Sequence, residues 1–154
     1  MRARELTVEE AEQPLGWRYP EPYATYDAEG PLGRDRGFFA VDDEAGELVG
    51  FGCTGFEARV PGVEEEAGTV DVGYGMRPDL IGRGLGRDFV GAVVAHASEG
   101  DPSARLRMSI LRWNERSRRV AEAHGFRVAG RSGEFDVLVR EPARKDGGAE
   151  YRPA

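Results

Sequence analysis

The sequence predicts one α+β domain, a fold class in which helices cover a sheet built largely from consecutive strands. Three observations lead to this class. The 154 residues suit a single hydrophobic core. Strand-like segments recur along the chain and are interrupted by segments with helical spacing. Several of the strand-like segments follow one another directly, as hairpins do, which does not fit a parallel sheet of βαβ units.

The N-terminal part begins with a short strand, expected over residues 4–8. A helix is expected over residues 8–17, and Pro14 should break it. Residues 16–31 contain several prolines and glycines and are expected to form a loop, although the loop is unusually rich in aromatic side chains.

A hairpin is expected next. Its strands cover residues 37–42 and 47–56, and Gly46 lies in the turn between them. In the segment Thr69–Met76, apolar and polar residues alternate, which predicts a further strand. No helical segment separates these strands, so we expect them to be neighbours in the sheet.

The second half of the chain predicts two helices. The first begins as a run of glycines ends and reaches Gly100. The strand Arg105–Leu111 follows it. Asn114 then has the side chain of an N-cap for a helix over residues 115–126, with Gly125 as its C-cap.

Two final strands are expected within residues 126–141, with a turn at Ser132 and Gly133. Residues beyond this point show no periodicity. The sequence therefore predicts one domain over residues 1–140 and a C-terminal tail over residues 141–154, with no internal repeat.

Composition and charge exclude several classes of function. The formal net charge of −7 argues against a nucleic-acid partner or an anionic membrane surface. No apolar run approaches a membrane span, and the first residues are too polar for a signal peptide. The soft metal ligands are limited to His96, His124 and the single Cys53, so we expect no zinc site and no intrachain disulfide. These features favour a cytoplasmic protein without a metal.

The stretch "LIGRGLGRDF" at residues 80–89 is the most informative motif. Gly82, Gly84 and Gly86 lie between a strand and a helix, where backbone N–H groups carry partial positive charge and glycine allows a bulky anion to approach. Arg83 and Arg87 add charge. The stretch fits either a phosphate-binding loop or a tight turn. It lacks the Gly-Lys-Ser/Thr of a P-loop and the glycine spacing of a dinucleotide fold.

The wider segment "VGYGMRPDLIGRGLGRDFV" resembles the acyl-CoA loop of the GNAT N-acetyltransferase superfamily, with Met76, Pro78, Gly84 and Gly86 on the family pattern. Ile81 departs from that pattern, which usually has Gln or Arg there. "NERSRRVAEAHGF" is a second match. It carries the family's Asn, small residue and Gly-Phe, and the resemblance covers residues 69–126.

The resemblance implies a mostly antiparallel central sheet of six or seven strands, splayed at the acyl-CoA site between Thr69–Met76 and Arg105–Leu111. The pantetheine arm would lie in that wedge, and the pyrophosphate would lie on the amides of residues 82–87. The residues expected to bind acetyl-CoA on this basis are Tyr74, Gly75, Met76, Gly82, Arg83, Gly84, Leu85, Gly86, Arg87, Asn114 and Ser117.

The resemblance also implies that an amine attacks the acetyl thioester directly, but the usual acid and base are missing. Ala121 stands where the family has a tyrosine acid, and Ser109 stands where many members have a glutamate base. Asp71 and Tyr74 are the substitutes that the sequence offers. Asp71 could instead be a solvated or edge carboxylate, and Tyr74 could equally be a core residue.

The acceptor would lie beside the aromatic loop, because the segment after the first strand commonly covers the acceptor pocket in this superfamily. The candidate acceptor-binding residues are Trp17, Tyr19, Tyr23 and Tyr26. The same rings could instead close the core under a long loop. The acidic run Glu64 to Glu66 could attract a cationic amine or could simply be solvated.

The sequence therefore predicts an acetyl-CoA-dependent N-acetyltransferase whose acceptor is a primary amine, on either a small molecule or a peptide N-terminus. The small residue Ala121, with residues 118–120 before it, resembles the branch that acetylates N-termini of ribosomal proteins. The alternative is a non-catalytic acyl-CoA-binding or sensing module, suggested by the missing acid and base. Family members are monomers or homodimers, and either state is expected here.

Overall fold

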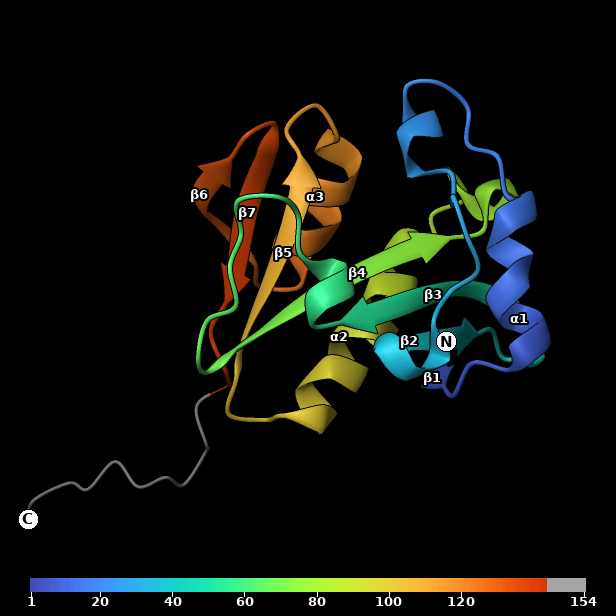
Figure 1. The fold of residues 1–154 in the computed structure, drawn as a ribbon, viewed down its shortest axis with the longest axis horizontal. Coiled ribbons are helices and arrows are strands. Elements are labelled where there is room, and N and C mark those ends of the chain that lie inside the picture. The colour runs from blue at the N-terminus through green and yellow to red at the C-terminus, as the bar shows by residue number, and fades with distance from the viewer. Residues whose placement is uncertain (144–154) are drawn as a thin grey trace, which may run out of the picture.

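The structure is a computed structural model that describes residues 1–143 of the chain (Figure 1). Most of the expected tail, residues 144–154, lies outside the described residues. Seven strands form one sheet in the order β1-β2-β3-β4-β5-β7-β6, and all neighbouring pairs except β4 and β5 are antiparallel. The predicted α+β fold class, with a sheet of six or seven strands flanked by helices, is confirmed.

The bounds of the elements agree with the sequence in most places. The strands are β1 (Arg2–Arg4), β2 (Phe38–Asp42), β3 (Leu48–Thr54), β4 (Thr69–Met76), β5 (Arg105–Leu111), β6 (Arg127–Ser132) and β7 (Phe135–Arg140). The α-helices are α1 (Val8–Glu12), α2 (Gly86–Gly100) and α3 (Glu115–Ala123). Short 3-10 helices are η1 (Gln13–Gly16), η2 (Tyr23–Tyr26), η3 (Arg34–Arg36), η4 (Phe56–Ala58) and η5 (Pro78–Leu80).

The first strand was expected over residues 4–8, and that position is wrong. β1 ends at Arg4, and Thr7 is the N-cap of α1. The Thr7 hydroxyl accepts from the N–H of Glu10, whose carboxylate accepts from the N–H of Thr7. This capping box satisfies two backbone donors and starts a helix where β-branched residues suggested a strand. Pro14 then lies in η1, where the α-helix has given way to a 3-10 turn.

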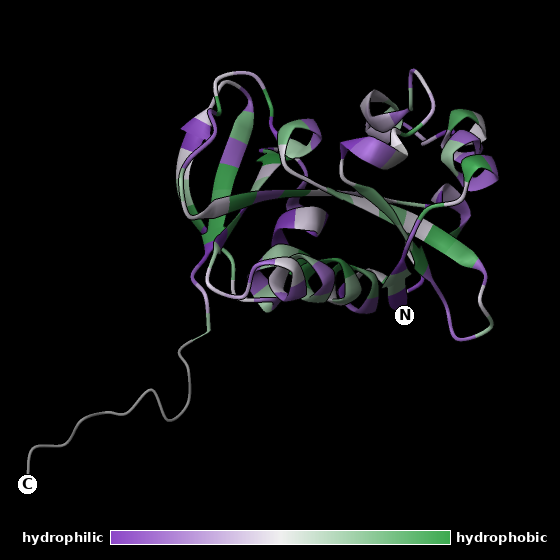
Figure 2. Ribbon diagram, turned by 60° about the horizontal axis from the view of Figure 1, so that its bottom comes forward, coloured by the Kyte–Doolittle hydropathy of each residue, from purple (hydrophilic) through white to green (hydrophobic). Residues whose placement is uncertain are grey.

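The main core lies between the sheet and α2. The helix buries Phe89, Val90, Val93 and Val94 against strands β1 to β4 and against α3. Figure 2 shows α2 running beneath the sheet, with hydrophobic residues on the central strands above it. A smaller cluster around Leu6 and Ala40 packs α1 against the sheet. The main cluster also includes Val72 of β4 and Met108 of β5, in the middle of the sheet.

The sheet divides between its two parallel strands. β4 and β5 pair only from Thr69↔Arg105 to Asp71↔Arg107. Beyond that point β4 continues to pair with β3 as far as Met76, and β5 continues to pair with β7 as far as Leu111. The two halves of the sheet therefore diverge, which confirms the expected splay of these strands (Figure 1).

Candidate active site

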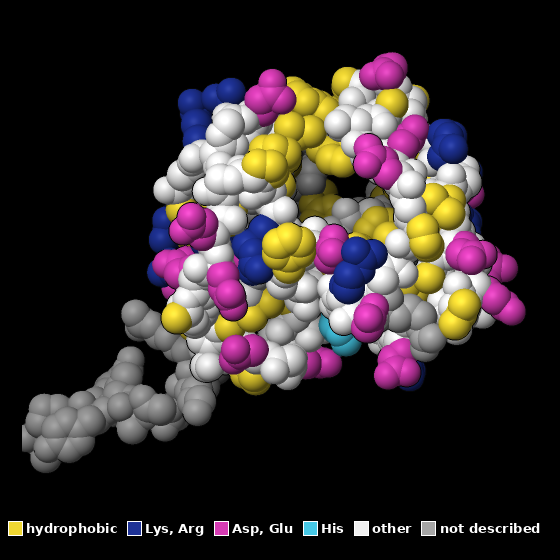
Figure 3. Space-filling view, viewed as in Figure 1, with side chains coloured by type: hydrophobic (Ala, Val, Ile, Leu, Met, Phe, Trp, Pro, Cys, Tyr) yellow, Lys and Arg dark blue, Asp and Glu magenta, His cyan; other side chains and the backbone are white. Residues whose placement is uncertain are grey.

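A cavity of about 540 Å³ lies where β4 and β5 diverge. Its walls come from residues 72–76 of β4, residues 108–110 of β5, and the first turns of α2 and α3. Figure 3 shows the molecule hollowed at this place, with hydrophobic side chains at the rim. The cavity is mainly apolar, as ligand-binding clefts usually are.

The glycine loop forms one end of the cavity. Gly82 and Gly84 have φ angles of +81° and +77°, and a Cβ added to either would meet nothing within 4 Å. These positions require glycine for their backbone conformation and leave open space in front of the loop. In the part of the chain that the structure describes, the backbone N–H groups of residues 82–88 have no protein acceptor. The loop and the start of α2 therefore present an array of donors that suits a phosphate.

The side wall of the cavity is a free strand edge. Residues 72–76 of β4 are paired on one side with β3, but the strand that should continue on the other side has diverged. Their backbone groups on that side can bond to an extended ligand as a neighbouring strand would. A narrow chain with amide groups fits this wall, and the pantetheine arm of coenzyme A is a chain of that kind.

Tyr74 and Ser117 meet inside the cavity. Their hydroxyl oxygens are 2.5 Å apart, so the side chains of β4 and α3 share a short hydrogen bond. Asn114 caps α3 by accepting from the N–H of Ser117, which fixes the serine beside the strand. Burial raises the pKa of the Tyr74 hydroxyl above its usual value, although the bond to Ser117 opposes this shift. Tyr74 is therefore a neutral proton donor at physiological pH.

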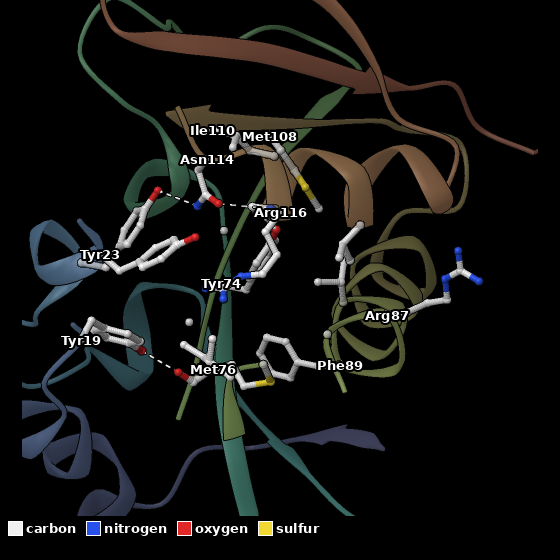
Figure 4. Close-up of a pocket in the computed structure, with 18 of the residues that line it drawn as sticks. Tyr19, Tyr23, Tyr74, Met76, Arg87, Phe89, Met108, Ile110, Asn114 and Arg116 are labelled. Carbon is white, nitrogen blue, oxygen red and sulfur yellow. Dashed lines mark hydrogen bonds between the residues drawn. The ribbon is translucent and has the colours of Figure 1, made fainter. Parts of the chain in front are cut away.

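The aromatic segment, residues 17–26, closes the opposite end of the cavity and is attached to both of its walls (Figure 4). The Tyr19 hydroxyl donates to the carbonyl of Met76 at 2.6 Å, and Asn114 donates to the Tyr26 hydroxyl at 3.0 Å. Tyr23 lies between them and packs edge-on against Trp113. Figure 4 places Tyr19 and Tyr23 on one side of the cavity and Arg87 on the other. The aromatic side chains and Arg87 thus lie at opposite sides of the cavity.

The structure brings together most of the residues expected to bind acetyl-CoA. Those that line the cavity are Tyr74, Gly75, Met76, Gly82, Gly84, Gly86, Arg87, Asn114 and Ser117. Arg83 and Leu85 do not line it. Leu85 is the N-cap residue of α2, and its carbonyl accepts from the N–H of Phe89.

Of the four aromatic residues expected near the acceptor, Tyr19, Tyr23 and Tyr26 line the cavity, but Trp17 does not. Trp17 packs on the small cluster around Leu6 and stacks on Phe51, so it supports the cavity wall from behind. The acidic run is also elsewhere. Glu66 pairs with Arg107, outside the cavity.

Asp71 is not placed to act as a base. Its side chain is 3% exposed and lies outside the cavity lining. The carboxylate accepts from Arg107 at 2.6 and 3.0 Å and from Arg59 at 3.2 Å. All of its oxygens are thus occupied by guanidinium donors, and the geometry points to a structural ion pair.

One lining residue that the sequence reasoning missed is Arg116. Its guanidinium lies over the Tyr23 ring, 4.4 Å from the ring centre. Its position two residues after the N-cap Asn114 was the available signal, since the first turn of a helix lies next to its cap.

The two positions that lack the usual acid and base also differ from each other: Ser109 lines the cavity, whereas Ala121 is buried in the core.

The sheet is split, and a glycine loop with free backbone donors lies at the split, an arrangement that suits an extended, phosphate-bearing ligand. The family profile of the acetyltransferase (GNAT) domain matches residues 4–127, which is most of the chain. The protein therefore belongs to the GNAT acetyltransferase family. The match begins well before the motifs at residues 69–126 and includes the aromatic segment.

Solved structures share the fold. The aminoglycoside acetyltransferase AAC(6')-Ib in complex with coenzyme A is 18% identical, with a TM-score of 0.71 over 91% of this chain and 94% of that one. The N-acetyltransferase PseH of Campylobacter jejuni is 14% identical, with a TM-score of 0.55 over 69% of this chain and 67% of that one. PseH has also been solved with acetyl coenzyme A. No curated protein matches the chain significantly.

Residues 1–143 contain neither a membrane-spanning helix nor a cluster of metal ligands. Among the helices of residues 1–143, none is both long enough and apolar enough to cross a membrane. Over the same residues, no three His, Cys, Asp or Glu side chains gather in a way that could hold a metal ion.

Proposed function

We propose that the protein transfers the acetyl group of acetyl-CoA to a primary amine. The observation that carries this proposal is the combination, in one cavity, of the unpaired N–H array at residues 82–88 and the Tyr74–Ser117 hydroxyl pair. The N–H array suits the pyrophosphate of the cosubstrate. The hydroxyl pair can give a proton to the sulfur as the thioester breaks.

The described residues fit coenzyme A in three places. The loop around Gly82 and Gly84 has room and donors for the pyrophosphate, and Arg87 adds a positive charge beside it. The open edge of β4 offers backbone partners to the pantetheine amides. The thioester would then lie beyond that edge, near Tyr74 and Asn114, where the cavity meets the aromatic segment.

Acetyl transfer forms a bond between the amine nitrogen and the thioester carbonyl carbon and breaks the bond from that carbon to sulfur. The leaving thiolate needs a proton, which Tyr74 can donate from its hydroxyl, held by Ser117. The attacking amine must lose a proton, and no Asp or Glu lines the cavity. We therefore assign no protein base. The neutral fraction of the amine enters, and its proton leaves to solvent through the open mouth. Alignment of the two reactants supplies much of the acceleration.

A non-catalytic acyl-CoA-binding module is the second candidate. The observation in its favour is the lack of a carboxylate among the lining residues, together with Ala121 and Ser109 at the places of the usual acid and base. Such a module would keep the cosubstrate site and lose turnover.

The two candidates differ in thiol release. The protein is incubated with acetyl-CoA and a panel that includes simple amines, amino acids, aminoglycosides and peptides with ribosomal-protein N-termini, and free CoA thiol is followed. Acceptor-dependent release supports the transferase. Micromolar CoA affinity by calorimetry without release on any acceptor favours the module. Absence of CoA binding would contradict both.

A further inference from the structure

We propose that the acceptor carries a carboxylate as well as its amine, and that Arg116 binds this carboxylate. The preferred acceptor is then a small amino acid-like molecule with an apolar or aromatic body. This inference rests on the proposed acetyl transfer and names the substrate class of the same cavity.

Arg116 lies at the acceptor end of the cavity. Its guanidinium lies over the Tyr23 ring and is close enough to influence the Tyr26 hydroxyl. Both tyrosines belong to the aromatic segment, and Figure 4 shows Tyr23 on the side of the cavity away from Arg87. Arg116 is thus separated from the region expected to hold the pyrophosphate.

The guanidinium of Arg116 has no acidic partner among residues 1–143. Ten other arginines of this range pair with carboxylates, including its neighbours Arg118 and Arg119 on α3. Arg116 instead lies over the Tyr23 ring and near the Tyr26 hydroxyl. A guanidinium that lies over an aromatic ring keeps N–H groups free, and these can bind a carboxylate in a bidentate geometry.

The other residues that line the cavity disfavour an acceptor with a second positive charge. No Asp or Glu side chain lines the cavity, so a second ammonium group would find no counter-ion there and would lie near the Arg116 charge. The net charge of −7 acts at long range, but short-range recognition depends on the groups that the ligand touches. The rings of Tyr23 and Tyr26 offer an apolar surface to the body of the acceptor.

The test compares acid and amide forms of one amine. Acetylation of phenylalanine and phenylalanine amide is measured with the wild-type protein and with the Arg116→Gln variant, and tryptophan with its amide is a second pair. The change in kcat/KM caused by the substitution is compared within each pair, because this comparison cancels the different basicities of the two amines. Spermidine serves as a polycationic probe.

We expect Arg116→Gln to lower kcat/KM about tenfold or more for the acids and less than twofold for the amides, with an unchanged Kd for CoA. Arg116→Lys should retain part of the preference, because it keeps the charge and loses the planar fork. Arg119→Gln is the matched control. Arg119 lies on the same helix with its side chain 77% exposed and outside the cavity. Its substitution should leave kcat/KM unchanged for both the acids and the amides.

An equal loss on acids and amides would overturn the proposal, and so would weaker CoA binding by Arg116→Gln. Spermidine as the best acceptor would also contradict it. Calorimetry of each acceptor with the CoA-bound protein separates this inference from the proposed transfer. If the acid binds more tightly than the amide and Arg116→Gln removes the difference, the site assignment holds even where no acetyl group is transferred.

Discussion

Asp71 of β4 and Arg107 of β5 form the last residue pair between these two parallel strands, and their side chains form an ion pair at that point. The guanidinium donates to both carboxylate oxygens, at 2.6 and 3.0 Å. Arg107 also donates to the carbonyl of Glu64, at 2.6 Å. The carboxylate raises the pKa of the Arg107 guanidinium above its usual value. This pair therefore closes the base of the wedge in which the cavity begins.

Asp71→Asn should lower the free energy of unfolding by about 3 kcal/mol, because it leaves Arg107 and Arg59 without their shared carboxylate in a buried place. Denaturant unfolding measures this loss. Glu66→Gln is the matched control, since Glu66 contacts the same Arg107 but its side chain is 51% exposed, and its loss should cost less than about 1 kcal/mol. A stable Asp71→Asn variant with a flattened pH–rate profile would instead restore Asp71 as a catalytic base.

Gly84→Asp should weaken CoA binding by well over tenfold, or more than about 1.4 kcal/mol. The substitution puts a side chain and a negative charge into the open space before the glycine loop. Gly46→Asp controls for backbone strain, because Gly46 has a similar φ of +82°, also faces open space, and lies in the β2–β3 turn away from the cavity. Both variants should lose similar stability, and only Gly84→Asp should lose CoA affinity by calorimetry. Equal CoA affinities for the two would move the phosphates away from this loop.

Tyr74→Phe should lower kcat about 100-fold while the Kd for CoA changes less than about threefold. The ring keeps its edge-on contact with Phe89, and only the hydroxyl bonded to Ser117 is lost. Ser117→Ala should reduce kcat less, because it loosens the hydroxyl without removing it. Steady-state kinetics with a good acceptor and calorimetry with CoA test the two effects separately. An unchanged kcat in a folded Tyr74→Phe variant would remove Tyr74 as the acid.

The pH dependence of the wild-type rate gives an independent check. Burial raises the pKa of Tyr74 above its usual value of about 10. The hydroxyl should therefore stay protonated, and kcat should show no falling limb up to about pH 10. The rise of kcat/KM with pH should follow the pKa of the chosen amine, because no lining carboxylate takes its proton. A rise that stayed at one pH for amines of different pKa would reveal a protein base.

Glu10→Gln should reduce stability at neutral pH by about 1–2 kcal/mol, discounted for the partial exposure of its partner Arg4. The Arg4 guanidinium, at 2.5 Å, is the main cause that lowers the pKa of Glu10 from 4.5 to about 2. Because the pKa is lower in the folded chain, this stability is present above pH 4.5 and is lost as the pH falls toward 2. Thermal unfolding of both proteins between pH 2 and 7 should show the difference shrink over that window. A difference independent of pH would contradict the ion pair as its cause.

Local signals in the sequence were sufficient for most elements. β4 and β5 have the bounds that alternation predicted, and Asn114 caps α3 as expected. Gly125 has a left-handed φ of +88° and directly follows the C-cap His124, one position from its expected role. The exception is the strand expected over residues 4–8. There the capping box of Thr7 and Glu10, a hydrogen-bonding pattern, outweighed the β-branched side chains.

The sequence alone determined the kinds of element and their order, because turns, caps and periodicity are set by neighbouring residues. It also contained the glycine loop, whose resemblance to the GNAT pattern implies an acyl-CoA ligand. Only the tertiary structure decided which side chains share the cavity. Pairing between distant segments placed β7 beside β5. It also put Asp71 in an ion pair with Arg107, outside the cavity, and brought the Tyr74 hydroxyl into hydrogen-bonding distance of Ser117. It also left Arg116 over Tyr23. These contacts join residues far apart in the chain, and no local pattern encodes them.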